Sequence, residues 1–451
     1  MDKRQWHKED IVETTITSLT FEGQGVARVG GMVLFVRGGV PGDAVRVRLT
    51  KIRKSFAEGE VIDITQPSPW RVAARCPHFG VCGGCASQNL SYDRQLANKA
   101  QQIREAIEHI GGLDVEVLPT LGMPEPWHYR NKMEFAFGEG DGGPYLGLME
   151  RASYERVTEI EQCFLATPRM MQAARRVETF ARSAGLYAYR PRDRTGTLRH
   201  LVVREGRRTG DLMLNLVTTS AVNPSTTLAS AVADLAPTTV LWSHNDTWGS
   251  VVRGDRVTVL SGSGNISERI GHLTLIVGPF SFLQTNSEMV EVLYATIAGQ
   301  AALTGSETVL DLYCGVGSIG LYLARQARRV VGIESVAEAI NDARQNAEQN
   351  NITNARFECA AVEDLSTLTY GAINPDVIVI DPPRAGLHPR LLAELRALAA
   401  PRLVYVSCNP AALARDLKAL SDVYRIGRVQ PVDMFPHTWH VESVVALTKR
   451  G

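Results

Sequence analysis

Residues 404–410 read VYVSCNP, an apolar run that leads directly into a cysteine, Cys408. Residues 377–384, VIVIDPPR, lead in the same way into Asp381, and residues 310–317, LDLYCGVG, end in a Gly-rich turn. Ligand sites of open α/β sheets lie at the carboxyl ends of parallel strands. The three stretches therefore predict a nucleotide-type cofactor loop, an acid and a thiol around one crevice.

From residue 281 onward the sequence alternates between strand-like and helix-like segments. The apolar, strand-like runs are 308–312, 329–333, 355–358, 377–380 and 402–406. The segments with helical periodicity are 288–302, 318–328, 337–350, 389–399 and 411–420. This alternation predicts a doubly wound, mostly parallel sheet, which is a Rossmann-like α/β domain.

Residues 11–66 contain five short strand-like runs between Gly- and Pro-rich turns, which predicts a small closed barrel of OB type. Residues 23–28, GQGVAR, and 40–43, VPGD, resemble the TRAM domain, a barrel appended to RNA-modifying enzymes. Basic residues crowd one stretch of the barrel, as in nucleic-acid-binding barrels: Arg46, Arg48, Lys51, Arg53 and Lys54.

The middle of the chain, residues 125–280, alternates apolar and polar residues in the manner of strands and follows a helix-like stretch around 92–110. We therefore divide the chain into four segments. They are a barrel (1–69), a β-rich central domain (70–92 and 125–280), a helical segment that packs on the α/β domain (93–124), and the α/β domain itself (281–451).

The composition is that of a soluble globular protein, with 44% hydrophobic and 21% charged residues among 451. No apolar run approaches the roughly 20 residues of a membrane span, and residues 1–10 are too polar for a signal peptide. We therefore expect a cytoplasmic monomer without membrane contact. Residues 151–210 hold 13 arginines against 6 acidic residues, which suits either contact with a phosphate backbone or a solvated face.

The turn at residues 311–317 is short and Gly-rich, as in class I methyltransferases, where the backbone approaches the cofactor closely. The next strand-like run ends in Glu334, where an acid would bind both ribose hydroxyls. A nicotinamide-dependent dehydrogenase would use similar groups, but the third glycine of its usual motif is missing. The loop thus favours a methyltransferase. Glu363 or Asp364 could reach the adenine or simply cap a turn.

Cys408 stands just before a helix-like segment whose N-terminus would stabilise a thiolate. A thiolate suits methylation at C5 of a pyrimidine, because addition of sulfur at C6 makes C5 a nucleophile. The C5 hydrogen must then leave as a proton, and Glu442 could remove it if its loop folds over the site.

Two other interpretations remain open. The DPPR sequence at Asp381 is similar to the loop of amino-group methyltransferases, in which Cys408 would be a small buried apolar residue. Alternatively, the chain binds RNA without catalysis, against which the intact Gly-rich turn and Glu334 argue.

Four short motifs resemble those of the RNA 5-methyluridine methyltransferases of RumA and TrmA type: FLQTN at 282–286, DPPR at 381–384, SCNP at 407–410 and DMFPHT at 433–438. The resemblance implies that Cys408 is the nucleophile and Glu442 the base that removes the C5 proton. It also implies a pocket for S-adenosyl-L-methionine (SAM), in which Asp381 also faces the uracil. The implied pocket residues are Gln284, Tyr313, Ser318 (where the family often has Asn), Glu334 and Asp381.

A cysteine cluster spaced C-x5-C-x2-C precedes the central domain, and one further cysteine lies within that domain. The four candidate ligands are Cys76, Cys82, Cys85 and Cys163. Clustered cysteines in a cytosolic protein are metal ligands before they are disulfides. Four thiolates could hold zinc, although the five-residue gap is wide for structural zinc, or an iron–sulfur cluster. The resemblance implies a [4Fe–4S] cluster. Cys314 and Cys359, at strand ends, are interpreted as packing residues.

The barrel and the cysteine motif together resemble the branch of the family that modifies 23S rRNA. Some archaeal tRNA enzymes carry both features as well, so a tRNA uridine is the alternative substrate. In either case the target base must be flipped into the crevice. We expect the RNA phosphates to run near Arg130, Lys132, Arg199 and Arg204, and on to barrel residues 46–54.

Overall fold

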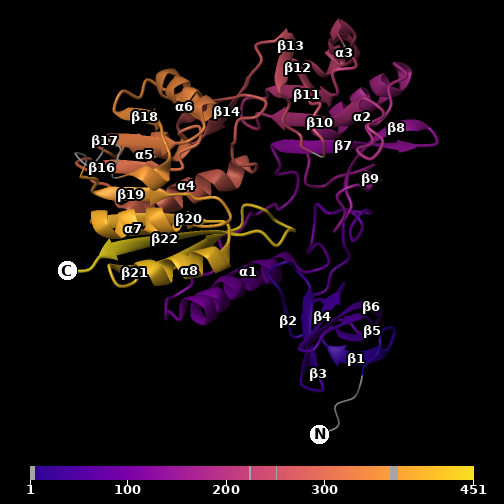
Figure 1. The fold of residues 1–451 in the computed structure, drawn as a ribbon, viewed down its shortest axis with the longest axis horizontal. Helices are drawn as coiled ribbons and strands as arrows, with labels where there is room; N and C mark the ends of the chain where they lie inside the picture. The colour runs from indigo at the N-terminus through magenta and orange to yellow at the C-terminus, as the bar shows by residue number, and fades with distance from the viewer. Residues whose placement is uncertain (1–5, 223–224, 250, 366–373) are drawn as a thin grey trace.

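The computed structural model describes residues 6–222, 225–249, 251–365 and 374–451, which form three parts in chain order (Figure 1). They are an N-terminal barrel, a central sheet and a C-terminal α/β sheet, and each has a hydrophobic core of buried apolar side chains. Helix α1 (Tyr92–Ala106) lies between the barrel and the α/β part in this view.

The barrel is a six-stranded sheet in the order β1-β5-β6-β4-β3-β2. Its strands are β1 (Ile11–Thr15), β2 (Ser18–Leu19), β3 (Gly25–Val29), β4 (Met32–Arg37), β5 (Ala44–Ile52) and β6 (Phe56–Gln66). Alternation along β5 turns Val47 and Leu49 into the core and Arg48 outward. Strand β6 crosses β5 closely at Gly59, where an added Cβ would lie 2.5 Å from Val47 Cγ1. The predicted barrel is confirmed, with six strands in place of the expected five.

The central part is a seven-stranded sheet in the order β13-β12-β11-β10-β7-β8-β9, antiparallel except between β11 and β12. Its strands are β7 (Lys132–Gly140), β8 (Gly143–Met149), β9 (Val157–Glu159), β10 (Leu198–Glu205), β11 (Leu212–Thr218), β12 (Thr239–His244) and β13 (Arg256–Gly262). Helix α2 (Pro168–Ser183) packs on β8 and β10, and α3 (Ser225–Ala231) and a 3-10 turn (Ala233–Leu235) complete that layer. Thr167 caps α2 by accepting a hydrogen bond from Met170 N at 3.1 Å.

A two-stranded hairpin, β14 (Ile266–Ile270) and β15 (Leu273–Val277), leads from the central sheet into α4 (Ser287–Ala301). Asn286 begins this helix, because its side chain accepts a hydrogen bond from Met289 N at 3.1 Å. The hairpin and α4 share one apolar core with one face of the α/β sheet.

The α/β sheet has the order β18-β17-β16-β19-β20-β22-β21, parallel through β20 and antiparallel beyond it. Its strands are β16 (Thr308–Leu312), β17 (Arg329–Glu334), β18 (Ala355–Cys359), β19 (Val377–Ile380), β20 (Arg402–Ser407), β21 (Tyr424–Val432) and β22 (Glu442–Lys449). The connecting helices are α5 (Ser318–Ala324), α6 (Ala337–Gln349), a 3-10 turn (Val362–Asp364), α7 (Pro389–Leu398) and α8 (Pro410–Leu420). The predicted doubly wound sheet is confirmed. Strands β21 and β22 were not predicted from the sequence.

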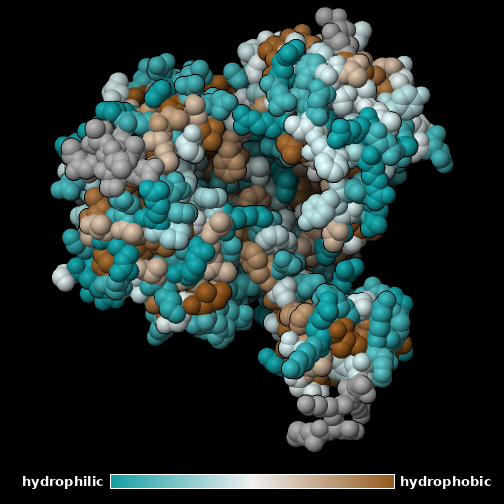
Figure 2. All heavy atoms as spheres, viewed as in Figure 1, coloured by the Kyte–Doolittle hydropathy of each residue, from teal (hydrophilic) through white to brown (hydrophobic). Residues whose placement is uncertain are grey.

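Helices cover both faces of this sheet. Buried side chains of α4, α5 and α6 line one face, and those of α1, α7 and α8 line the other. Helix α1 ends in a π-helical turn (Ile107–Gly111) that packs on α8, and residues 117–121 then run beside β21. Figure 2 shows a hollow between the α/β part and the central sheet, and the carboxyl edge of the α/β sheet faces the central part in Figure 1.

Candidate active site and cysteine cavity

The carboxyl edge of the α/β sheet brings together the Gly-rich turn at 311–317, Asp381 and Cys408. Leu312 pairs with Ile380, and Ile380 pairs with Tyr405, so β16 and β19 end at the same level and β20 ends two residues beyond it. Asp381 continues this pairing, since its amide donates to Leu312 O at 3.4 Å. The predicted shared edge of cofactor loop, acid and thiol is therefore present.

Glu442 joins this edge through strand register. It is the first residue of β22, which runs antiparallel to β20 with Ser407 opposite Ser443. Cys408 directly follows the last pair of this ladder, so Cys408 and Glu442 are neighbours across two strands. The expectation that Glu442 reaches the site on a folded-over loop is wrong. The continuous apolar run at residues 444–447 is the sequence pattern that could have revealed the strand.

The thiol and the two carboxyl groups lie in an environment that disfavours negative charge. Burial, then the carboxylates of Glu442 and Asp381, raise the pKa of Cys408 to about 11, while Arg384 acts in the opposite direction. Burial and Asp381 raise the pKa of Glu442 well above its ordinary value, again opposed by Arg384. Burial raises the pKa of Asp381 to about 6. At neutral pH the Cys408 thiol therefore holds its proton.

Helix α8 begins two residues after Cys408 and is capped by a side chain. Asn409 caps α8, because its Oδ1 accepts from Ala411 N at 3.0 Å and from Ala412 N at 3.4 Å. The leading amides of the helix are thus satisfied by Asn409. Burial and two carboxylates raise the pKa of Cys408 overall, and the predicted stabilisation of a thiolate by this helix N-terminus stays a prediction.

Arg384 is the cation of the site, and sequence reasoning assigned it no role. Its Nη2 lies 2.9 Å from His440 Nδ1 and 3.1 Å from Nε2, and its Cζ lies 5.4 Å from the Trp439 ring centroid. Asn409 Nδ2 donates to the Arg384 carbonyl at 2.9 Å. The sequence did contain a pointer to Arg384, since amino-group methyltransferases place an aromatic residue where this chain has arginine.

The loop between β21 and β22, residues 433–440, is held by distant parts of the chain. The carbonyls of residues 434–437 each accept a hydrogen bond from another segment. The donors are Asn286 Nδ2 to Met434 (3.0 Å), Lys99 Nζ to Phe435 (3.1 Å), Tyr129 Oη to Pro436 (3.0 Å), and the amides of Ala86 and Ser87 to His437 (2.9 and 3.1 Å). This loop, which leads into Glu442, is therefore fixed at nearly every residue.

A buried ion pair anchors the start of the same loop. Lys99 Nζ on α1 lies 2.6 Å from Asp433 Oδ1, and the two side chains are 3% and 0% exposed. Tyr92 Oη donates to Asp433 Oδ2 at 2.9 Å. Burial lowers the pKa of Lys99, and Asp433 opposes that effect. Such a pair is costly to break, because either partner alone would be an uncompensated buried charge.

The Gly-rich turn after β16 has the backbone that a close cofactor contact requires. Tyr313, Gly315 and Gly317 all have positive φ (60°, 52° and 78°). Glu334 Oε2 accepts from Gly315 N at 3.3 Å, which places this carboxylate beside the turn. Burial raises the pKa of Asp311 to about 8, and among the described residues its Oδ1 has no partner. The turn, the acid and this buried oxygen fit a nucleoside-type cofactor.

The remaining predicted pocket residues border this turn or lie against it. Ser318 Oγ lies 2.6 Å from Tyr294 Oη of α4, so its hydroxyl already has a partner. Tyr313 Oη donates to Glu363 Oε1 at 3.4 Å, which brings Glu363 to the same place; the side chain of Asp364 lies outside the described part of the chain. Gln284 is 8% exposed, and its carbonyl accepts from Asn131 Nδ2 at 2.9 Å.

A second cavity, of about 560 Å³, is lined by all four cysteines of the predicted metal site: Cys76, Cys82, Cys85 and Cys163. Burial is the largest cause that raises the pKa of the first three thiols, that of Cys85 to about 12, and proximity to Cys163 adds to the effect. Arg130 and Arg151 also line the cavity. We call it the cysteine cavity.

The four thiols of the cysteine cavity are not arranged around a single metal ion in the described structure. Tetrahedral zinc, about 2.3 Å from each sulfur, would draw the sulfurs to within about 4 Å of one another. Among the described residues, no group of three or more His, Cys, Asp or Glu side chains is placed so that it could coordinate one metal ion. Four thiols around a cavity of this size are, by contrast, the donor set of an iron–sulfur cluster.

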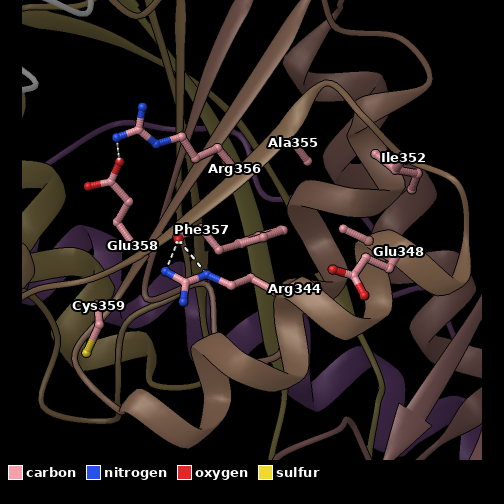
Figure 3. A pocket seen from close by; sticks show the side chains of 9 residues that line it. Arg344, Glu348, Ile352, Ala355, Arg356, Phe357, Glu358 and Cys359 are labelled. Atoms are coloured by element: carbon pink, nitrogen blue, oxygen red, sulfur yellow. Dashed lines mark hydrogen bonds and ion pairs between the residues drawn. The ribbon is translucent and has the colours of Figure 1, made fainter.

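Another pocket, of about 620 Å³, lies at the outer edge of the α/β sheet and is separate from these sites (Figure 3). Three of its charged side chains are engaged locally: Arg344 donates to Phe357 O, and Arg356 pairs with Glu358. Cys359 lines this pocket, is exposed, and lies 3.6 Å from Ser335 O. The interpretation of Cys359 as a packing residue is therefore wrong, whereas Cys314 is buried as predicted.

The residues expected to contact RNA phosphates divide into two groups. Arg199 and Arg204 are 4% and 3% exposed, and Arg204 Nη2 donates to Ser281 O at 2.5 Å. Burial lowers the pKa of Arg204 to about 10. The expectation that these two arginines meet phosphates is wrong, because both are part of the packed interior. Arg130 and Lys132 are partly exposed and line the cysteine cavity.

Several barrel cations are already paired with acids on neighbouring strands. Arg48 pairs with Glu60, and Lys51 Nζ lies 2.6 Å from Glu58 Oε1. Such exposed pairs are weak and open readily to a competing phosphate.

In the described parts of the chain, no helix has both the length and the apolar character needed to cross a membrane.

A doubly wound sheet with a Gly-rich turn, a carboxylate beside that turn, and an acid and a thiol at the same edge is typical of a class I SAM-dependent methyltransferase. Residues 273–450 match the family model described as tRNA (Uracil-5-)-methyltransferase, and residues 7–62 match the TRAM domain. The chain is 41% identical over 447 residues to an uncharacterized RNA methyltransferase of Halalkalibacterium halodurans, covering 98% of this chain and 97% of that protein. The chain belongs to the RNA uracil-5-methyltransferase family.

Two further comparisons span the same length. An uncharacterized RNA methyltransferase of Caldanaerobacter subterraneus is 37% identical over 458 residues, covering 98% of this chain and 99% of that protein. The crystal structure of Pyrococcus abyssi tRNA (uracil-54, C5)-methyltransferase in complex with S-adenosyl-L-homocysteine aligns with a TM-score of 0.79 and 32% identity. It covers 97% of this chain and 99% of its own. The predicted family, fold and SAM dependence are thereby confirmed.

Proposed function

We propose that this enzyme methylates C5 of one uridine in 23S rRNA, with Cys408 as nucleophile and Glu442 as general base. The observation that carries the proposal is the position of Cys408 beside Glu442 at the edge that also holds Asp381. An amino-group methyltransferase has no use for a thiol and a second acid at this place. We retain Gln284, Tyr313, Ser318, Glu334 and Asp381 as SAM-pocket residues, and the four-segment division of the chain, as parts of the same proposal.

The proposed chemistry gives each group at the edge a proton to hold or move. The Cys408 thiol first gives its proton to water, its thiolate Sγ then bonds to C6 of the uracil, and Asp381 faces the ring. When bound, SAM supplies the methyl group that C5 takes up. Glu442 then removes the C5 proton, the C5–C6 double bond re-forms, and the bond between C6 and Sγ breaks. Arg384 lowers the pKa of both Cys408 and Glu442, so it favours the charged forms that these steps need.

A uridine in tRNA is the second candidate substrate. The observation that favours it is the Pyrococcus abyssi enzyme, which acts on uracil-54 of tRNA and aligns with nearly the whole chain, barrel included. Mapping 5-methyluridine in rRNA and tRNA of a strain lacking this enzyme separates the two. Loss of one 23S rRNA site supports the first proposal, and loss of a tRNA site replaces it with the second.

We also propose that Cys76, Cys82, Cys85 and Cys163 hold a [4Fe–4S] cluster with a structural role. The cavity that all four thiols line supports the proposal, because four cysteines are the donor set of such a cluster. Protein purified without air should contain about four irons per chain. A colourless protein with one tightly held zinc would refute this assignment.

The chemical proposal is tested by trapping. RNA with 5-fluorouridine at the target should form a complex with the enzyme that survives denaturant, since fluorine cannot leave as a proton. Cys408→Ala should form none. If Cys408→Ala still methylates RNA, the nucleophile has been misassigned.

A further inference from the structure

Two aromatic side chains of the central part, Tyr187 and Trp248, are unusually exposed, at 65% and 73%. Tyr187 begins a segment, residues 187–197, that folds back on itself through backbone hydrogen bonds. Trp248 lies against this segment, because its Nε1 donates to Pro191 O at 3.1 Å. We call residues 187–197 together with Trp248 the arginine turn. Leaving two large aromatic surfaces in water forgoes the stabilisation that their burial would provide.

The loop that presents Trp248 is held by buried polar groups. Asn245 is fully buried, and its side chain makes four hydrogen bonds within the loop, to Thr247 N (2.9 Å), Thr247 Oγ1 (2.6 Å), Val251 O (2.6 Å) and Arg253 O (2.8 Å). The buried guanidinium of Arg199 donates to the carbonyls of Asn245 (3.1 Å), Thr247 (2.8 Å) and Gly249. These bonds fix the backbone on both sides of Trp248. The exposed position of the indole is therefore built into the fold.

The arginine turn is also strongly basic. Arg190, Arg192 and Arg194 are all exposed, and Asp193 is the single acid among them. Arg192 lies 3.2 Å from Glu155, in a pair whose side chains are 81% and 60% exposed and which water weakens. Within the described part of the chain, Arg190 and Arg194 form no ion pair. Two arginines beside two aromatic faces are thus free to meet a partner.

The same loop reaches the carboxyl edge of the α/β sheet. Arg253 Nη2 lies 3.3 Å from Glu338 Oε1 in the first turn of α6, which begins shortly after Glu334. The Arg253 guanidinium also lies over the Phe280 ring, with its Cζ 5.8 Å from the centroid. The chain that follows Trp248 therefore contacts the α/β part within four residues of Glu334, the acid beside the cofactor turn.

We propose that the arginine turn binds unpaired nucleotides of the RNA substrate next to the target uridine. Trp248 and Tyr187 stack on bases, and Arg190 and Arg194 contact the flanking phosphates. Stacking on aromatic side chains combined with cationic backbone contacts is how proteins hold single-stranded nucleic acid. Exposed Trp, Tyr and Arg also occur at protein interfaces, but a surface with three arginines and one acid favours a polyanion. This proposal rests on the proposed function, because its partner is the RNA substrate.

The test compares binding of the full-length protein to a single-stranded RNA and to a duplex of the same sequence. Trp248→Ala and Tyr187→Ala should each weaken binding of the single strand about fivefold to a hundredfold, and binding of the duplex far less. Trp248→Phe, which keeps an aromatic face, should recover most of the affinity. Arg190→Ala and Arg194→Ala should each lower the slope of log affinity against log salt by about 0.7.

Two controls make the result specific. Arg425→Ala and Arg428→Ala remove exposed arginines of β21, away from the arginine turn, and should leave the single-strand affinity and salt slope nearly unchanged. Binding of S-adenosyl-L-homocysteine should be unchanged in all variants. Wild-type affinity of Trp248→Ala for the single strand, or equal losses on single strand and duplex, would overturn the proposal. Failure of the proposed function shows differently, as a wild-type protein that gives no adduct with 5-fluorouridine RNA.

Discussion

Cys408 and the cysteines of the cysteine cavity are all partly or fully buried, yet their charged neighbours differ. Carboxylates flank Cys408, with Arg384 as the one opposing group. Around Cys82 and Cys85 the charged neighbours are other thiols and Arg130. A thiol that must release and regain a proton needs acceptors beside it, whereas thiols that hold a metal group as thiolates need cations. The same residue type thus serves two purposes, and its neighbours distinguish them.

Removal of the Cys408 thiol tests the difference between Cys408 and the other cysteines most directly. Cys408→Ala should reduce RNA methylation below detection, because no other described group at the edge can add to C6. The matched control is Cys359→Ala, which removes an exposed thiol from the end of edge strand β18 of the same sheet and should leave the methylation rate within about twofold. Both rates are measured with the same RNA and labelled SAM. Comparable losses in the two variants would show that exposure, and not the carboxylate neighbours, marks the important cysteine.

The next largest effect concerns the loop that leads into Glu442. Lys99→Met leaves Asp433 buried without its cation, and should lower the free energy of unfolding by about 3–5 kcal/mol. Gln101→Ala, on the exposed side of the same helix, should cost less than about 0.5 kcal/mol. Urea unfolding followed by circular dichroism measures both. A loss below about 1 kcal/mol for Lys99→Met would mean that the pair does not anchor the loop.

The raised pKa of Cys408 predicts a pH dependence. The attacking form is the thiolate, and the pKa lies near 11, so the thiolate fraction rises as the pH rises toward that value. Trapping by 5-fluorouridine RNA should therefore accelerate about tenfold per pH unit between about pH 7 and 9. Arg384→Gln removes the group that lowers this pKa and should be slower at each pH. A flat profile would mean that the thiol is already ionised when RNA is bound.

The smallest effect on the covalent step is expected at the cysteine cavity. Cys163→Ser should lose the iron and lower the melting temperature, while the folded fraction still forms the 5-fluorouridine adduct within about tenfold of the wild-type rate, or about 1.4 kcal/mol in the barrier. Iron analysis, calorimetry and single-turnover trapping measure the three quantities. Complete loss of trapping by a folded Cys163→Ser protein would mean that the cysteine cavity, like Cys408, is needed for the covalent step.

Local patterns in the sequence were enough to predict the edge that carries Asp381 and Cys408, because parallel strands end together whatever surrounds them. They were not enough for Glu442, whose place depends on the antiparallel register of β22, a long-range property. Arg199 and Arg204 illustrate the same limit. An arginine in a basic segment resembles a phosphate contact until the packing shows that its guanidinium serves buried carbonyls. The role of Lys99 likewise depends on Asp433, more than three hundred residues away in the chain.

Cys408 as nucleophile and Glu442 as base are the two central roles of the proposed mechanism. One measurement tests both. Glu442→Gln protein is incubated with unmodified target RNA and SAM, denatured, digested and analysed by mass spectrometry. We predict a covalent adduct between a methylated uridine and the peptide containing Cys408, because the C5 proton cannot be removed and the sulfur cannot leave. Release of free 5-methyluridine at the wild-type rate, or an adduct on any other cysteine, would contradict the account.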